Sequence, residues 1–156
     1  MTEFKKGYKH TPERIQQIRE TTIKLMKSGK FPKQTNSKPE QQIKEELLIR
    51  GYVEEKDFIH QFKFMNKFLC DFCFPKEKVI VEAYGDYWHC NPRIYSKPKN
   101  SQQLRAIAKD KFKESYIRKI DNDSWTYLII WESDIKKNVS ECVDKIEEVL
   151  AEKKKI

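Results

Sequence analysis

Between residues 58 and 74, side chains alternate with a period of two in two runs, 58–64 and 68–74, and a third short run that begins with apolar residues follows at 79–84. The connections are short: Asn66-Lys67 fits the first turn, and Pro75-Lys76-Glu77-Lys78 the second. A period of two is that of a β-strand, and connections of this length join antiparallel neighbours. The segment therefore predicts a three-stranded antiparallel meander, around which the rest of the chain must fold.

Helical patterns flank this meander on both sides. Thr11-Pro12-Glu13 provides an N-cap, a proline and an acid in the first turn, which predicts a helix over about 11–28. Further helices are predicted over 37–50, 101–120 and 139–153. The inner face of the third of these four helices is expected to carry Leu104, Ile107, Phe112, Tyr116 and Ile120.

The segment 125–131 (WTYLIIW) is a continuous apolar run, as in a strand buried on both faces. The element order from residue 37 is then α-β-β-β-α-β-α. It predicts an α/β fold in which helices flank a mixed sheet. Residues 1–36, a basic helix and a linker rich in Pro, Ser, Asn and Lys, form an N-terminal appendage to a domain of residues 37–156.

Positive charge is concentrated in two blocks. The chain has a net charge of +8, with ten Lys/Arg against three Asp/Glu in residues 1–39 and nine against two in residues 93–119. A polyanion partner is expected, since each neutralised phosphate releases counterions; a solubilising basic tail is the alternative. No apolar run reaches membrane length and no signal peptide is evident, which predicts a cytoplasmic, nucleoid-associated protein with four reduced cysteines.

Two carboxylates fall at opposing positions of the meander. Asp71 lies in mid-strand and Glu82 on the following strand, and counting outward from the turn at 75–78 makes them close to cross-strand neighbours. Carboxylates held a few ångströms apart repel unless a cation lies between them, and hard divalent cations prefer oxygen ligands. The pair predicts a metal site; a carboxylate paired with a lysine at the rim of the sheet is the alternative.

Glu40 is open to two interpretations. Ser37-x-x-Glu40 matches the capping box, in which the glutamate folds back to the first amide of the helix. Alternatively, Glu40 reaches the sheet edge from its helix and helps to hold the metal.

His89 and Asp110 are candidates for proton transfer. His89 follows the third strand beyond a glycine, so it can turn back toward the metal and accept or orient a water proton. Asp110 lies among Lys109, Lys111 and Lys113 in a predicted helix, where an ion pair with Lys113 is the structural alternative. These lysines form either a solvated face or contacts to phosphates.

Cys70-x-x-Cys73 and His89-Cys90 raise the question of zinc. Residues three apart in a strand point to opposite faces, so the two thiols are expected to diverge, whereas zinc fingers place this spacing on a turn. No zinc site is therefore predicted. Tyr87 and Trp88 can fill a core, but the basic residues that follow them favour stacking on bases or wedging between base steps.

Four segments together resemble the very-short-patch-repair-like endonucleases of the PD-(D/E)xK superfamily. They are Ser37-x-x-Glu40, FLCDFCFP, VIVEAYGDYWHCNPRIY and AKDKFKESYIRKIDNDSWTYLIIWESDIKKN, and the resemblance covers about residues 37–150. It is greatest to a branch that includes phage homing endonucleases with a Glu–Asp–His–Asp constellation. GYKHTPERIQQIRE also weakly resembles the small DNA-binding helices attached to homing endonucleases.

The resemblance implies a PD-(D/E)xK core and a DNA endonuclease that depends on Mg²⁺ or Mn²⁺. Asp71 would be the central metal ligand, with Glu40 as the helix-borne acid and Glu82 at a strand position that often carries an acid. His89 would assist the attacking water, and Asp110 would match the acid of the helix that follows.

Double-stranded DNA is the partner that this resemblance implies. Tyr87 and Trp88 would match aromatic residues that intercalate into DNA in patch-repair enzymes. The basic residues expected to contact the backbone are Arg93, Lys97, Lys99, Lys109, Lys113, Lys9 and Arg14. A homodimer on DNA is left open, as is the choice between homing, repair and restriction.

The sequence departs from the family pattern at Tyr84. This residue occupies the position two after Glu82, where the E-x-K signature of the superfamily has a lysine, so catalysis is expected to depend more on His89. The missing lysine motivates an alternative, a non-catalytic DNA-binding module with a degenerate nuclease core. A zinc-stabilised RNA-binding domain is a third hypothesis. Mismatch specificity is not implied, because the zinc cysteines of patch-repair enzymes are not clearly matched.

Overall fold

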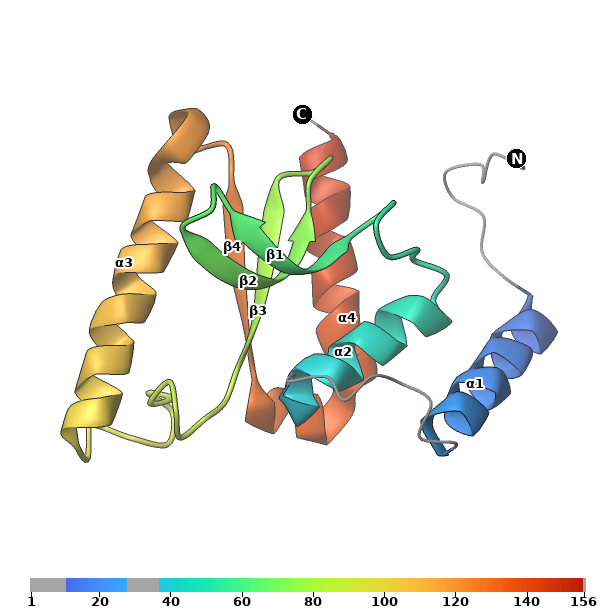
Figure 1. Cartoon of the computed structure of the whole chain (residues 1–156), viewed down its shortest axis with the longest axis horizontal. Helices are drawn as coiled ribbons and strands as arrows, with labels where there is room; N and C mark the ends of the chain where they lie inside the picture. Colours follow the sequence, from blue (N-terminus) through green and yellow to red (C-terminus); the bar gives the residue numbers. More distant parts are fainter. Residues whose placement is uncertain (1–10, 28–36, 156) are drawn as a thin grey trace.

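The computed structural model describes residues 11–27 and 37–155 (Figure 1). Its elements are α1 (Pro12–Lys27), α2 (Lys38–Ile49), β1 (Ile59–Phe64), β2 (Phe68–Phe74), β3 (Val79–Tyr84), α3 (Ser101–Asp123), β4 (Thr126–Trp131) and α4 (Glu132–Lys154). From α2 onward this is the predicted α-β-β-β-α-β-α order, preceded by the predicted N-terminal helix.

The strands form one mixed sheet in the order β1-β2-β3-β4. β1, β2 and β3 are the predicted antiparallel meander, and β4 runs parallel to β3 after the crossover through α3. The first turn is centred one residue earlier than predicted, on Met65 and Asn66, which both have positive φ. Lys67 closes this turn by donating its backbone N–H to the carbonyl of Phe64 at 3.0 Å. The α/β class is thereby confirmed.

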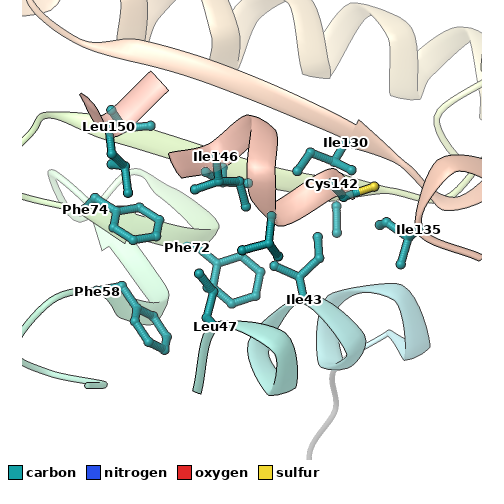
Figure 2. Packing of buried hydrophobic residues seen from close by; sticks show 14 residues of the cluster. Ile43, Leu47, Phe58, Phe72, Phe74, Ile130, Ile135, Cys142, Ile146 and Leu150 are labelled. Carbon is teal, nitrogen blue, oxygen red and sulfur yellow. The ribbon is translucent and has the colours of Figure 1, made fainter. Parts of the chain in front are cut away.

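Helices cover both faces of the sheet: α2 and α4 pack on one face and α3 on the other (Figure 1). Figure 2 shows the core beneath α2 and α4, where apolar side chains of these helices meet Phe72 and Phe74 of β2 and Ile130 of β4. β3 is buried along its whole length and supplies both cores alternately. Each large apolar side chain buried in this way contributes about 1.5–3 kcal/mol.

The predicted inner face of α3 is wrong in part. Leu104 and Phe112 are 60% and 56% exposed, whereas Ile117 and Gln103 are buried. The face turned toward the sheet also carries Asp110 and Lys113, whose partners belong to other elements. Since this face is largely polar, its position could not be found from the spacing of apolar residues.

The last helix begins earlier than predicted, at Glu132 directly after β4. A break occurs at Asn138, which has φ −162° and ψ 94°, and the Asn138 Oδ1 accepts a hydrogen bond from the N–H of Glu141 at 3.2 Å. Asn138 thus caps a second helical segment. The predicted start at residue 139 is the start of that segment.

α1 lies outside the three layers, beyond α2 (Figure 1). Its predicted N-cap is confirmed, since Thr11 Oγ1 accepts a hydrogen bond from the N–H of Arg14 at 3.3 Å. Most of the predicted linker, and Lys9, lie outside the described residues. Among the helices that the structure describes, none has the length and apolar character needed to cross a membrane.

Candidate active site

Asp71 and Glu82 lie next to each other on adjacent strands, as predicted. The β2–β3 register pairs Phe72 with Val81, and one step outward places Asp71 opposite Glu82. Asp71 Oδ2 accepts a hydrogen bond from the backbone N–H of Ala83 at 2.8 Å. The Glu82 residue is only 3% exposed. A buried carboxylate beside a second one is a costly arrangement, of the kind that functional sites retain.

Burial and mutual repulsion raise the pKa of both carboxyl groups. Desolvation, followed by the charge of Asp71, raises the pKa of Glu82 to about 8. Desolvation, followed by the charge of Glu40, raises the pKa of Asp71. A hydrogen bond between the two carboxyl groups raises the pKa of Glu82 and lowers that of Asp71. A cation near this pair would relieve the repulsion.

A lysine from α3 reaches the same carboxyl pair. Lys113 Nζ contacts Glu82 Oε1 and donates a hydrogen bond to the backbone carbonyl of Leu69 at 2.6 Å. Lys113 was predicted to contact the DNA backbone from a solvated row of lysines. Its side chain is only 13% exposed, so in this structure it does not face solvent in the predicted way. The alternative of a carboxylate paired with a lysine is the arrangement observed for Glu82.

Glu40 combines parts of both interpretations made from the sequence. Ser37 caps α2, because its Oγ accepts a hydrogen bond from the N–H of Glu40 at 3.4 Å. The Glu40 carboxylate is buried and faces β1, where its Oε1 lies 2.8 Å from His60 Nε2 and accepts a hydrogen bond from Gln61 Nε2. The carboxylate therefore reaches the sheet, and its charge acts on Asp71.

His60 and Gln61 belong to the site but were not predicted from the sequence. A second interaction engages the same histidine, since Lys44 Nζ lies 3.4 Å from His60 Nδ1. A signal was present in the sequence: His60 interrupts the alternating phenylalanines Phe58, Phe62 and Phe64 at a position that should carry an apolar residue. A polar side chain at such a position requires a partner.

His89 and Asp110 form a hydrogen-bonded dyad, with Nδ1 2.6 Å from Oδ2. Asp110 therefore pairs with His89 instead of Lys113, its structural alternative. The ring of Tyr84 stacks on the imidazole at a centroid distance of 3.9 Å and an interplanar angle of 6°. A carboxylate on Nδ1 fixes the ring and leaves Nε2 as the proton acceptor of the neutral imidazole. This is the geometry of an oriented general base.

The loop after β3 is shaped by its own polar groups. Asp86 Oδ1 accepts hydrogen bonds from Asn91 Nδ2 at 2.8 Å and Ser133 Oγ at 3.2 Å, and the N–H of Asn91 donates to the Asp86 carbonyl at 2.8 Å. The N–H of His89 donates to the Gly85 carbonyl at 3.1 Å. The hydrogen bonds between Asp86 and Asn91 thus close the loop and direct His89 back toward the sheet.

The carboxyl pair and the dyad are joined through α3 and β3. Asp110 and Lys113 lie three residues apart on α3, where side chains are neighbours about 5–6 Å apart at Cβ. Glu82 and Tyr84 lie two residues apart on β3 and so share one face. Both clusters consequently lie between α3 and the sheet, within one helical turn of each other.

Tyr87 and Trp88 are 41% and 58% exposed beside the dyad. The Tyr87 hydroxyl accepts a hydrogen bond from Asn100 Nδ2 at 2.9 Å, and its backbone carbonyl accepts one from Gln103 Nε2 at 2.8 Å. Trp88 meets the Tyr87 ring edge-on, with ring centroids 5.3 Å apart. An anchored tyrosine thus supports a projecting tryptophan.

The predicted DNA-contacting cations have different surroundings. Arg93 forms a two-point ion pair with Asp134 at 3.1 and 2.8 Å, and Lys99 Nζ lies 5.3 Å from the centroid of the Tyr95 ring. The remaining described members are exposed: Lys97, Lys109 and Arg14.

The expectation that Cys70 and Cys73 diverge is wrong, because both pack in the core beneath α3. The β1–β2 register skips the Gln61–Asp71 position, and Gln61 has a φ of 56°. This irregularity breaks the alternation of β2 at Asp71 and turns Cys70 to the same side as Cys73. Burial raises the pKa of both thiols to about 12, so both remain protonated. All four cysteines are free.

Among the described residues, no three His, Cys, Asp or Glu side chains converge as a preformed metal-binding group. Of the three predicted ligands, Asp71 and Glu82 are adjacent, while Glu40 is engaged by His60 and Gln61. Comparison of the chain with protein-family models, curated proteins and solved structures gives no match. The chemistry of the site must therefore be inferred from its own side chains.

Proposed function

We propose that this chain is a Mg²⁺-dependent DNA endonuclease that hydrolyses phosphodiester bonds, similar to the very-short-patch-repair-like branch of the PD-(D/E)xK superfamily. The observation that carries the proposal is the placement of the Asp71–Glu82 pair and the His89–Asp110 dyad in one layer, between α3 and the sheet. The first cluster suits a hard cation, and the second suits a proton taken from water.

The carboxyl pair fits a divalent cation on two grounds. Its donors are carboxylate oxygens, the ligand type that Mg²⁺ prefers, and burial together with neighbouring carboxylates raises the pKa of both groups, so their ionised forms lack compensation. Glu82 Oε1 is fully buried and has no well-aligned hydrogen bond, even though Lys113 touches it. Asp71 and Glu82 would hold the ion, with Glu40 nearby. When bound, the ion supplies Lewis-acid activation of the phosphate and of a water.

His89 provides the general base of the proposed reaction. Its Nδ1–H is held by Asp110, so Nε2 is free to accept a proton from the attacking water, and the carboxylate then stabilises the imidazolium. Stacking on Tyr84 fixes the plane of the ring. Tyr84 thus has a role in orienting the histidine at the position where the E-x-K signature has a lysine.

A direct test is the cleavage of supercoiled plasmid in Mg²⁺. The expected result is nicked or linear DNA that accumulates with Mg²⁺ or Mn²⁺. No product should form when EDTA is added, because the proposed reaction needs a divalent ion to activate the phosphate and the water. The substrates should include mismatched and branched duplexes. Absence of cleavage with either ion on all of these DNAs would contradict the proposal.

One observation favours a second candidate, a DNA-binding module without catalysis. The ammonium of Lys113 already partly neutralises Glu82. If this pair were permanent, the site would have no need of a divalent ion. This candidate predicts DNA binding that EDTA leaves unchanged, together with no cleavage in the plasmid assay.

Trp88 is expected to be an anchor for DNA. Trp88→Ala should weaken binding to a bent or distorted duplex by about tenfold, because a stacked base is worth roughly 1–3 kcal/mol. Folding should be unaffected, since the side chain is 58% exposed. Fluorescence anisotropy in EDTA measures the affinity, with Ile94→Ala, an exposed apolar residue in the same segment, as the matched control. A loss no larger than that of Lys97→Ala would exclude a wedge.

A further inference from the structure

The lysine that is missing from the sequence next to Glu82 is supplied in space by another element. Tyr84 holds the E-x-K position, and its hydroxyl is occupied, 2.7 Å from that of Tyr127. Lys113 extends from α3 instead and places its ammonium against Glu82. The carboxyl pair thus has an internal cation whose source is 31 residues further along the chain than Glu82.

The Lys113 ammonium has two contacts in the site, and they leave the charge of the carboxyl pair incompletely balanced. Its contacts are Glu82 Oε1 and the backbone carbonyl of Leu69. Glu82 Oε1 nevertheless lacks a well-aligned hydrogen bond. The single positive charge of Lys113 also acts on two carboxyl groups, Asp71 and Glu82, and so cannot balance both. A divalent ion would satisfy Asp71 and Glu82 together, whereas Lys113 contacts only one of them.

Lys113 also has a route out of the site. Its side chain is a flexible four-carbon stem, and its neighbours on α3, Lys111 and Phe112, are exposed. Leu69, whose carbonyl holds the ammonium, is itself 52% exposed. The Lys113 side chain itself is 13% exposed, and rotation of its stem can move the ammonium toward this exposed surface while the helix stays in place.

We propose that Lys113 is an exchangeable counter-cation of the Asp71–Glu82 pair, which a divalent ion displaces on binding, so that Lys113 sets the metal affinity of the site. The proposal rests on the proposed function in one respect only, the assignment of Asp71 and Glu82 as metal ligands. The displaced ammonium remains within reach of the site, where it can pair with a DNA phosphate. Lys113 thus exchanges a carboxylate partner for a phosphate partner.

The test is the affinity of the DNA-free protein for Mn²⁺, measured by isothermal titration calorimetry and by thermal unfolding. Lys113→Met should bind Mn²⁺ about tenfold more tightly than wild type, because a competing positive charge is removed. Without metal this variant should unfold at a lower temperature, since Glu82 loses its partner, and Mn²⁺ should raise its Tm more than that of wild type. Lys119→Met, an exposed lysine on α3, should behave as wild type.

Equal or weaker Mn²⁺ binding by Lys113→Met, or no binding by either protein, would overturn the proposal. Lys113→Arg gives a second measurement should the methionine variant fail to fold. Arginine pairs with carboxylates through two hydrogen bonds, so it should be displaced less readily and reduce Mn²⁺ affinity. Because no DNA is present, tighter binding by Lys113→Met without plasmid cleavage would support the exchange and reject the nuclease.

Discussion

Asp71→Asn is expected to abolish Mg²⁺-dependent DNA cleavage and at the same time to stabilise the protein. Loss of the central carboxylate should reduce cleavage about 10³-fold or more, because metal activation is worth several kcal/mol. The gain in stability arises because the same negative charge that would bind the metal is unfavourable in the metal-free protein. The pKa of Asp71 is raised by burial and by Glu40, so the ionised form opposes folding. Asparagine removes that charge and keeps an oxygen for the N–H of Ala83.

The pH dependence of this gain has a defined sign. A carboxyl group with a raised folded pKa stabilises the protein while protonated, and this stabilisation is lost as pH rises through the folded pKa. The difference in unfolding free energy between Asp71→Asn and wild type should therefore grow as pH increases above 3.8, the ordinary pKa of aspartic acid, and reach about 1 kcal/mol.

Thermal unfolding across pH, combined with the plasmid assay, measures both effects. Glu148→Gln removes an exposed carboxylate from α4 and serves as the control that should change neither cleavage nor stability. Cleavage by Asp71→Asn at the wild-type rate would remove Asp71 from the site. A fall in its stability at neutral pH would show instead that the Asp71 charge supports the fold.

The sheet and the carboxyl pair could be predicted because both depend on local rules. Period-two alternation with short turns fixes the antiparallel meander, and counting from the turn at 75–78 brings Asp71 opposite Glu82 without knowledge of any other element. The family resemblance named His89 and Asp110 as members of one constellation, but their pairing was not predicted. Their contact depends on the folded loop at 85–91 and on the placement of α3 over the sheet.

The parts that could not be predicted have a common physical cause. Apolar spacing identifies the buried face of a helix only if that face packs in a core, whereas α3 turns Gln103, Asp110 and Lys113 toward polar partners and leaves Phe112 exposed. The position of Cys70 was missed for a related reason. The irregularity at Gln61 shifts the alternation by one residue, and no composition signal marks it.

His89→Ala is expected to reduce the cleavage rate about 10²- to 10⁴-fold, the range typical of a lost general base. DNA affinity in EDTA and Mn²⁺ affinity should remain close to wild type, because His89 contacts Asp110 and Tyr84 and is not one of the proposed metal ligands. Asp110→Asn should cause a comparable loss, since an amide can donate to Nδ1 and hold the ring in the wrong tautomer. Single-turnover cleavage of a radiolabelled duplex measures both rates.

The double variant separates a working dyad from two independent residues. If Asp110 acts only through His89, then His89→Ala combined with Asp110→Asn should cleave no more slowly than His89→Ala alone, because residues that act as a unit are non-additive. Added imidazole should restore part of the activity of His89→Ala, which a purely structural role for His89 does not allow. Multiplicative losses without rescue by imidazole would mean that the proton is taken by a different group, and that His89 and Asp110 serve only to shape the loop that carries Trp88.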